Sequence, residues 1–385
     1  MTASALRLSA APLDPSTETL REEVRRFLRE EIENGGFVPM VDCWVRGSSP
    51  EFSRKLGARG WLGMTWPREY GGGGRSHQER FVVVEELLAA GAPVAAHWVA
   101  ERQIGLSLVR FGTPEQRDRL MPAIARGESY FGAGYSEPDV GSDLASVRTR
   151  ATRTANGWSI IGRKVWTSQA HIADHFFVLT RTSTEAKKHD GLTMFIVPLP
   201  DARITIRPLP LLNSEHHFNE VTFDGVEVPD SGVVGEVGGG WKVITAELAI
   251  ERSGPERFLS VLPLLREMVR RARDEPLGGH AAVVIGELAA RLRTLRAMSI
   301  AVATEIESGG NPAVQAALVK DLGTRFEGDV VEAARSLWPV APQLHAKDRY
   351  ADLVAQAVMH APTFTLRGGT NEVLRGIVAR GLGVR

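Results

Sequence analysis

Two short motifs in the first half of the chain carry residue types that suit ligand binding. Residues 134–143 read GYSEPDVGSD, and this mixture of turn formers and small hydroxyl residues predicts a loop whose backbone N–H groups face a ligand. Residues 164–170 read KVWTSQA, which predicts a strand with Trp166 and Ser168 on the same side. An indole can cover one face of a planar heteroaromatic molecule while a hydroxyl bonds to its edge. Taken alone, the second motif also fits a half-buried strand tryptophan beside a hydrogen-bonded serine.

The second half of the chain offers acidic residues that could act as a general base. They lie in the stretch TAELAIERSGPERF. Glu251 follows three apolar residues, and partial burial against them would raise its pKa toward the value that a base needs. Pro255 has no N–H to donate to the Glu251 carbonyl, so the helix should end or bend beside this carboxylate. Glu247, one helical turn earlier, is the main rival, and Glu256 ranks third. Glu251 is also consistent with an ordinary solvated helix charge.

The histidines and the cysteine suggest no metal site and no disulfide framework. His171, His175 and the pair at 216–217 have no supporting carboxylate or cysteine pattern, so we interpret them as structural. Cys43 is the single cysteine, which excludes an internal disulfide and indicates a reducing compartment. We expect it to be a small buried hydrophobic residue.

Length and charge narrow the class of protein. A chain of 385 residues allows two or three domains, or one large enzyme subunit with an ample core. Lys plus Arg and Asp plus Glu both total 46, so no basic excess points to nucleic acid or to an anionic membrane. The N-terminal residues lack the apolar core of a signal peptide, and the longest apolar-looking run is too short to cross a bilayer. We expect a soluble, cytoplasmic protein.

Three regions of different periodicity position these motifs. Residues 17–127 show apolar residues at helical spacing, with Ser16 or Thr17 as the expected N-cap of the first helix. Residues 130–235 contain β-branched and aromatic runs separated by turn formers, which predicts a β-domain. Long Ala/Leu/Arg-rich segments after residue 236 predict a helix bundle. This order excludes a simple Rossmann or barrel enzyme, and the glycine runs at 71–74 and 238–240 fit turns better than phosphate loops.

Five motifs, in order along the chain, resemble those of the acyl-CoA dehydrogenase family: WPREYGGGG, GYSEPDVGSD, KVWTSQA, FDGVEVP and GGTNEVLRGIVARGLG. The resemblance covers nearly the whole chain. It implies an α+β multidomain fold with an N-terminal α-helical domain at 1–129, a middle β-barrel-like domain at 130–235 and a C-terminal four-helix bundle at 236–385. It also implies FAD as the cofactor and oxidation of an acyl-CoA thioester to the 2,3-enoyl-CoA. In that reaction a carboxylate removes the α-proton while the β-hydrogen passes to the flavin as hydride.

The resemblance also implies roles for individual residues. Those expected at the cofactor are Tyr135, Ser136, Trp166, Ser168, Thr370 and Glu372. Those expected at the substrate are Gly141, Ser142 and Arg252. Ser136 and Ser168 would bond to the flavin ring, against which Trp166 would pack. Thr370 and Glu372 would approach the ADP half of the cofactor.

One functional residue of the family is missing from its usual place. Many members carry the catalytic glutamate just before the Gly-Thr of the terminal motif, where this chain has Gly368. A subset that resembles isovaleryl-CoA and long-chain dehydrogenases carries it in a Glu-Arg pair on a bundle helix, and Glu251 and Arg252 stand at that place. The resemblance therefore implies that Glu251 is the base. The backbone N–H of Gly368 would still hold the thioester oxygen.

The predicted assembly departs from that of the common homotetramers. In those homotetramers a neighbouring subunit completes the FAD site through an arginine just before a Phe-Gly pair and through a Gln-x-x-Gly-Gly loop. In this chain the matching arginine, Arg273, is one place out of register, and the loop is absent. This pattern resembles actinobacterial steroid side-chain dehydrogenases, which are often α2β2 heterotetramers. A homodimer or homotetramer stays open, as does a substrate carried on an acyl carrier protein. An electron-transfer flavoprotein is the expected partner. The alternatives are a non-catalytic or cofactor-sharing subunit, and a flavin oxidase or monooxygenase.

Overall fold

The computed structural model describes residues 8, 12–185, 187–275 and 279–384, except for the side chains of residues 248–251. Backbone contacts divide the chain into two compact units. The helical unit comprises Met1–Gly47, Ser76–Pro93 and Ala249–Arg385, and the sheet unit comprises Ser48–Arg75 and Val94–Leu248. Segments from both halves of the sequence therefore contribute to the helical unit.

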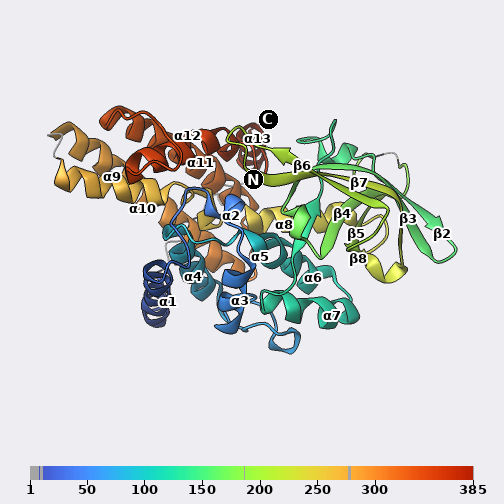
Figure 1. Ribbon diagram of the computed structural model, residues 1–385. Coiled ribbons are helices and arrows are strands. Elements are labelled where there is room, and N and C mark those ends of the chain that lie inside the picture. The colour runs from blue at the N-terminus through green and yellow to red at the C-terminus, as the bar shows by residue number, and fades with distance from the viewer. Residues whose placement is uncertain (1–7, 9–11, 186, 276–278, 385) are drawn as a thin grey trace. The chain divides into compact units, whose positions relative to one another are not determined.

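The described strands of the sheet unit form one eight-stranded sheet (Figure 1). They are β1 (Phe131–Gly134), β2 (Arg150–Thr154), β3 (Gly157–Ser168), β4 (His175–Arg181), β5 (Leu192–Pro198), β6 (Ile204–Pro210), β7 (His216–Val228) and β8 (Val233–Val234). Their order is β6-β7-β3-β2-β4-β5-β8, with β1 paired to β4. Most neighbours are antiparallel, but β4 is parallel to β1 and β2. The runs GWSIIGRKVWTS, HFFVLTRT, GLTMFIVPL and NEVTFDGVEV, which are rich in β-branched and aromatic residues, correspond to β3, β4, β5 and β7 and confirm the predicted β region.

Burial differs between the middle and the edge of the sheet. Strands β4 and β5 are buried along almost their whole length because both faces are covered. Edge strand β6 instead alternates half-buried and exposed residues. Strand β3 alternates over most of its length, but its pairing with β7 shifts register between Lys164 and Thr167. This bulge interrupts the motif that carries Trp166.

Short helices complete the sheet unit. They are α3 (Pro50–Ala58), α5 (Ala95–Val99), α6 (Gly105–Phe111) and α7 (Pro114–Ala125), with α8 (Gly240–Glu251) following the sheet. Helix α7 begins with a capping box in which Thr113 and Gln116 satisfy each other's backbone N–H groups. Close packing is strict beside α6, because a Cβ on Gly105 would lie 2.0 Å from the Trp66 ring.

The helical unit is built from longer helices. They are α1 (Ser16–Glu33), the short α2 (Cys43–Arg46), α4 (His77–Ala89), α9 (Leu262–Asp274), α10 (Gly279–Glu307), α11 (Ala313–Leu337), α12 (Arg349–Phe364) and α13 (Asn371–Gly381). Helix α11 contacts α9, α10, α12 and α13 (Figure 1). This arrangement confirms the predicted C-terminal bundle, to which α1 and α4 add from the first part of the chain.

Of the predicted helix boundaries, one is wrong and one is confirmed. The expected N-cap at Ser16 or Thr17 is wrong, because Pro15 takes that position and Asp14 accepts hydrogen bonds from Ser16 instead. The predicted break near Pro255 is confirmed: α8 ends at Glu251, and a short 3-10 turn follows before α9. Cys43 is buried as expected. Among the described residues, no helix combines the length and apolar character needed to cross a membrane.

Candidate active site

A buried ion pair fixes the predicted ligand-binding loop at 134–143. The Lys164 ammonium is fully buried and donates to the Glu137 carboxylate at 2.9 Å and to the Tyr135 carbonyl at 3.0 Å. The same carboxylate accepts the backbone N–H groups of Arg148 and Thr149. Burial lowers the pKa of Lys164 to about 8. Burial alone would raise the pKa of Glu137, but Lys164 and these hydrogen bonds lower it.

The pairing attaches the loop to strand β3 directly beside Trp166. The N–H of Val165 donates to the carbonyl of Ser136 at 2.9 Å, so Ser136 lies next to the strand bulge. Ser136 and Ser168 are both half-buried, whereas Gly141 and Ser142 are exposed in the loop. The structure thus brings Ser136 to the motif that carries Trp166 and Ser168.

Trp166 has an unusual backbone and an exposed ring. Its φ is +60°, a left-handed conformation that large side chains rarely adopt. The bulge places the indole in solvent, where 58% of the residue is exposed, with Phe218 packed edge-on at 5.9 Å. Thr167 beside it is completely buried. A bare indole face flanked by half-buried hydroxyls has the chemistry that a planar heteroaromatic ring requires, so these residues fit the ring of a flavin.

Tyr135 is bonded to the rival base. Its hydroxyl donates to Oε2 of Glu247 at 2.5 Å, and Glu247 is only 4% exposed. Tyr135 therefore connects the loop of the first motif to helix α8.

The side chain of Glu251, the predicted base, lies outside the described residues. Its backbone is the last residue of α8. Arg252, the other member of the Glu-Arg pair, is half-buried, and its Nε donates to the carbonyl of Gly368 at 3.4 Å. The pair and the terminal motif, which are separated by over a hundred residues in sequence, therefore meet within the helical unit. Glu256, the third candidate, is completely buried.

Gly368 has no room for the side chain that it replaces. Its φ is +68°, and a Cβ there would lie 2.9 to 3.0 Å from the guanidinium of Arg257. Arg257 is 1% exposed and its guanidinium lies 5.2 Å from the Trp44 ring, so it cannot simply move into solvent. A glutamate at position 368 would therefore compete with a buried arginine for the same space.

The backbone around Gly368 is held on its carbonyl side and open on its N–H side. Lys320 donates to the carbonyl of Gly369 at 2.7 Å, close to the Arg252 contact. Within the described residues no backbone or side-chain acceptor takes the Gly368 N–H. An unused, fixed N–H is suited to bind an oxygen that gains negative charge.

The remaining predicted cofactor residues lie at the start of α13. Thr370 is the N-cap of this helix, and its hydroxyl accepts the Val373 N–H at 3.4 Å. Glu372 in the first turn is exposed. A backbone N–H and the Thr370 hydroxyl hydrogen-bond to the Glu372 carboxylate and lower its pKa.

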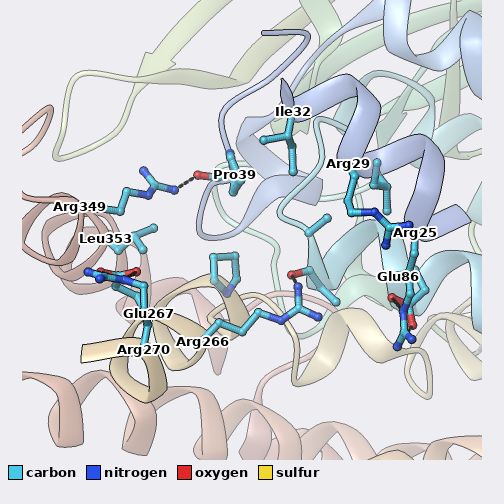
Figure 2. A pocket seen from close by; sticks show the side chains of 14 residues that line it. Arg25, Arg29, Ile32, Pro39, Glu86, Arg266, Glu267, Arg270, Arg349 and Leu353 are labelled. Atoms are coloured by element: carbon cyan, nitrogen blue, oxygen red, sulfur yellow. Dashed lines mark hydrogen bonds and ion pairs between the residues drawn. The ribbon is translucent and has the colours of Figure 1, made fainter. Parts of the chain in front are cut away.

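A pocket of about 490 Å³ in the helical unit lies apart from these residues (Figure 2). Its arginines come from α1, α9 and α12. Most are neutralised by carboxylates, as in Arg25–Glu86, Arg270–Glu267 and Arg349–Asp352. No predicted site residue lines it, and we assign it no part in the candidate site.

Sequence reasoning missed the residues that hold the site in place. Lys164 and Glu137 stand inside the quoted motifs, and a lysine in a β-rich motif together with an acidic residue in a nearby loop could have suggested a buried pair. Arg257 gave no such signal, because its contact with Gly368 depends on the fold.

Family models now identify the chain. It matches the N-terminal domain of acyl-CoA dehydrogenase over residues 14–128, the middle domain over 132–226 and the C-terminal domain over 238–383. The protein is an enzyme of the acyl-CoA dehydrogenase family, whose members are FAD flavoproteins.

One relative and two solved structures illustrate the similarity. Acyl-CoA dehydrogenase IpdE1 of Mycobacterium tuberculosis is 34% identical, with 94% of this chain and 96% of the relative covered. The structure of the Tcur3481-Tcur3483 steroid ACAD has a TM-score of 0.86 at 31% identity, covering 99% of this chain and 100% of the other. The ChsE4-ChsE5 complex from Mycobacterium tuberculosis has a TM-score of 0.81 at 29% identity, covering 99% and 100%.

Proposed function

We propose that the protein oxidises a bulky or branched acyl-CoA thioester to the 2,3-enoyl-CoA, with Glu251 as the base. The observation that carries this proposal is the environment of Gly368. A buried arginine fills the place of the usual glutamate, while the Glu-Arg pair reaches the same motif through Arg252. The name of the Tcur3481-Tcur3483 steroid ACAD supports a bulky acyl group.

The cofactor in this proposal is FAD, bound by residues of three motifs, GYSEPDVGSD, KVWTSQA and GGTNEVLRGIVARGLG. Ser136 and Ser168 would bond to the flavin ring, and the exposed face of Trp166 would cover it. Tyr135 supports the loop, and Thr370 and Glu372 would contact the ADP half. When bound, FAD would accept the β-hydrogen as a hydride.

The substrate groups complete the scheme. Gly141 and Ser142, exposed in the loop, would border the acyl chain. The Gly368 N–H would donate to the thioester oxygen, which acidifies the α-carbon, and Glu251 would then remove the α-proton. Arg252 would carry positive charge beside the carbonyl-binding backbone. We also propose the domain limits 1–129, 130–235 and 236–385, which agree closely with the extents of the three family models.

Replacement of the base tests the scheme. Glu251→Gln should lower kcat on acyl-CoA thioesters about 10³-fold with little change in KM, because a general base typically contributes 10²- to 10⁴-fold. Glu247→Gln is the matched control and should keep most of the activity, since Tyr135 already binds that carboxylate. The measurement is flavin reduction by a panel of straight, branched and ring-bearing acyl-CoAs. Loss of activity in Glu247→Gln alone would move the base to Glu247. Full activity in both variants would refute a base on α8.

A heteromeric assembly is a second part of the proposal. Two similar structures are named as pairs of proteins, and the glutamine-glycine loop of homotetramers is absent here. We propose that this chain supplies the base in such a pair, with an electron-transfer flavoprotein as the acceptor. The flavin-to-chain ratio of the protein purified alone tests the assembly: about one flavin per chain would refute the need for a second protein.

A further inference from the structure

A buried carboxylate, Asp42, lies at the centre of a charged cluster in the helical unit. Its side chain is completely buried, and Arg367 Nη1 lies 2.6 Å from each of its oxygens. His360 Nδ1 lies 3.0 Å from Oδ2. The second arm of Arg367 donates to the Ser260 hydroxyl at 3.0 Å. Trp44 stacks on the Arg367 guanidinium, with 4.2 Å between guanidinium and ring centre.

The Asp42 side chain does not cap the helix that follows it. Asp42 is the N-cap of α2, where an aspartate normally accepts the N–H groups of its own helix, yet its side chain makes no such bond. Its φ is +57°, a strained backbone that the Asp42 N–H to Ser260 carbonyl bond of 2.8 Å helps to hold. The bonds to Arg367 and His360 offset the strain and the lost cap.

The charged cluster lies directly beside the Gly368 N–H, the group proposed to bind the thioester oxygen. Arg367 directly precedes Gly368, so the peptide that carries the Gly368 N–H begins at the carbonyl of Arg367. The far side of Gly368 is fixed by Arg252, and Gly369 by Lys320. On the other side of this peptide, the Arg367 side chain forms an ion pair with the buried Asp42 and so holds Arg367 against the protein interior.

We propose that Asp42 is a positioning residue of the active site, which orients the Gly368 N–H toward the thioester oxygen by holding Arg367. This inference rests on the proposed function, because it assumes that the N–H binds that oxygen. His360 also hydrogen-bonds to Oδ2 of Asp42. The cluster thus links α12, the loop before α2 and the terminal motif to one peptide group.

A binding ratio separates this role from a merely structural one. The panel above identifies the acyl-CoA that the flavin-loaded wild type oxidises fastest. Its enoyl-CoA product and the thioether with the same skeleton, which lacks the carbonyl oxygen, are then titrated by calorimetry. Wild type should bind the enoyl-CoA, which is a thioester, more tightly than the thioether. Asp42→Asn should reduce that preference at least about ten-fold and kcat about 10²-fold, because a displaced donor loses most of its effect, with thioether affinity within about two-fold of wild type.

Matched variants keep the outcome clear. Glu86→Gln removes another buried carboxylate of the helical unit, which pairs with Arg21 and Arg25 on α1 and makes no hydrogen bond or ion pair with the cluster within the described residues. It should keep the wild-type preference for the thioester even if it lowers thermal stability as much as Asp42→Asn does. Arg367→Lys retains the charge without the two-armed contact, should show an intermediate loss, and carries the test if Asp42→Asn does not fold.

The failures are distinguishable. If no acyl-CoA of the panel reduces the flavin of the wild type, the proposed function fails and this inference with it. If the wild type works and a folded Asp42→Asn or Arg367→Lys keeps the full thioester preference, Asp42 has no positioning role.

Discussion

Gly368 and Trp166 share a left-handed backbone but stand in opposite surroundings. Gly368, with φ of +68°, has Arg257 and Arg252 packed against it and follows Arg367, which pairs with the buried Asp42. Trp166, with φ of +60°, presents more than half of its surface to solvent. Neighbouring side chains therefore fix the position of Gly368. The Trp166 ring instead stays accessible to a ligand.

The difference indicates how each position is used. A peptide group that must bind one oxygen requires fixed geometry, which buried ionic contacts supply at a cost in desolvation. An aromatic face that covers a ring needs area and access more than a single fixed angle. Substitutions should therefore disturb stability around Gly368 and ligand binding around Trp166.

The largest expected effect is a pH dependence from Glu327, which is completely buried on α11 beside this cluster. Burial raises its pKa from 4.5 to about 7, opposed by Arg367 and reinforced by Asp42. Between these pH values the folded protein keeps a proton that the unfolded chain loses, so the free energy of unfolding should fall as pH rises from 4.5 to 7. The decrease should be at most about 3 kcal/mol.

Glu327→Gln should remove that slope in denaturant titrations across the pH range. Asp42 acts in the opposite sense, because its pKa is lowered, and its contribution is lost below about pH 4. Glu332→Gln, an exposed change on the same helix, is the control and should keep the wild-type slope. An unchanged slope in Glu327→Gln would show that another group titrates.

A methyl group at Gly368 should have the next largest effect. Gly60 has the same φ of +68°, but no atom lies within 4 Å of the place that a Cβ would take, so Gly60→Ala should cost only about 1 kcal/mol for the backbone. Gly368→Ala should cost about 2 kcal/mol more, because Arg257 must move. Equal losses in urea unfolding would show that the guanidinium yields freely.

Trp166→Ala should have the smallest effect on stability, below about 0.5 kcal/mol, because the ring is mostly exposed. Flavin affinity should nevertheless fall about ten-fold, the size of one aromatic contact. Ile161→Ala, also on β3 and 59% exposed, is the control and should leave flavin affinity unchanged. Both values follow from flavin release and thermal unfolding of the same samples. Unchanged flavin affinity in Trp166→Ala would contradict the assigned ring contact.

Much of the fold follows from periodicity. Strand-like runs became β3, β4, β5 and β7, and the Gly- and Pro-containing segments ESGGNP and LWPVAP separate α10, α11 and α12, since turn residues act locally. The N-cap of α1 was wrong because Asp14 and Pro15, outside the expected pattern, provide the helix start. The bulge at Trp166 was also not predicted, because a two-residue period cannot reveal a register shift that depends on the partner strand.

The sequence by itself determined the family, the order of helical and β regions, and the absence of a carboxylate at position 368. These depend on residue types and on their spacing along the chain. Only the tertiary structure decided that Arg257 fills the space beside Gly368, that Lys164 is buried against Glu137, and that Asp42 reaches Arg367 across more than 300 positions. Such contacts join residues that are remote in sequence, so their geometry is settled by how the helices and strands pack and not by any local pattern.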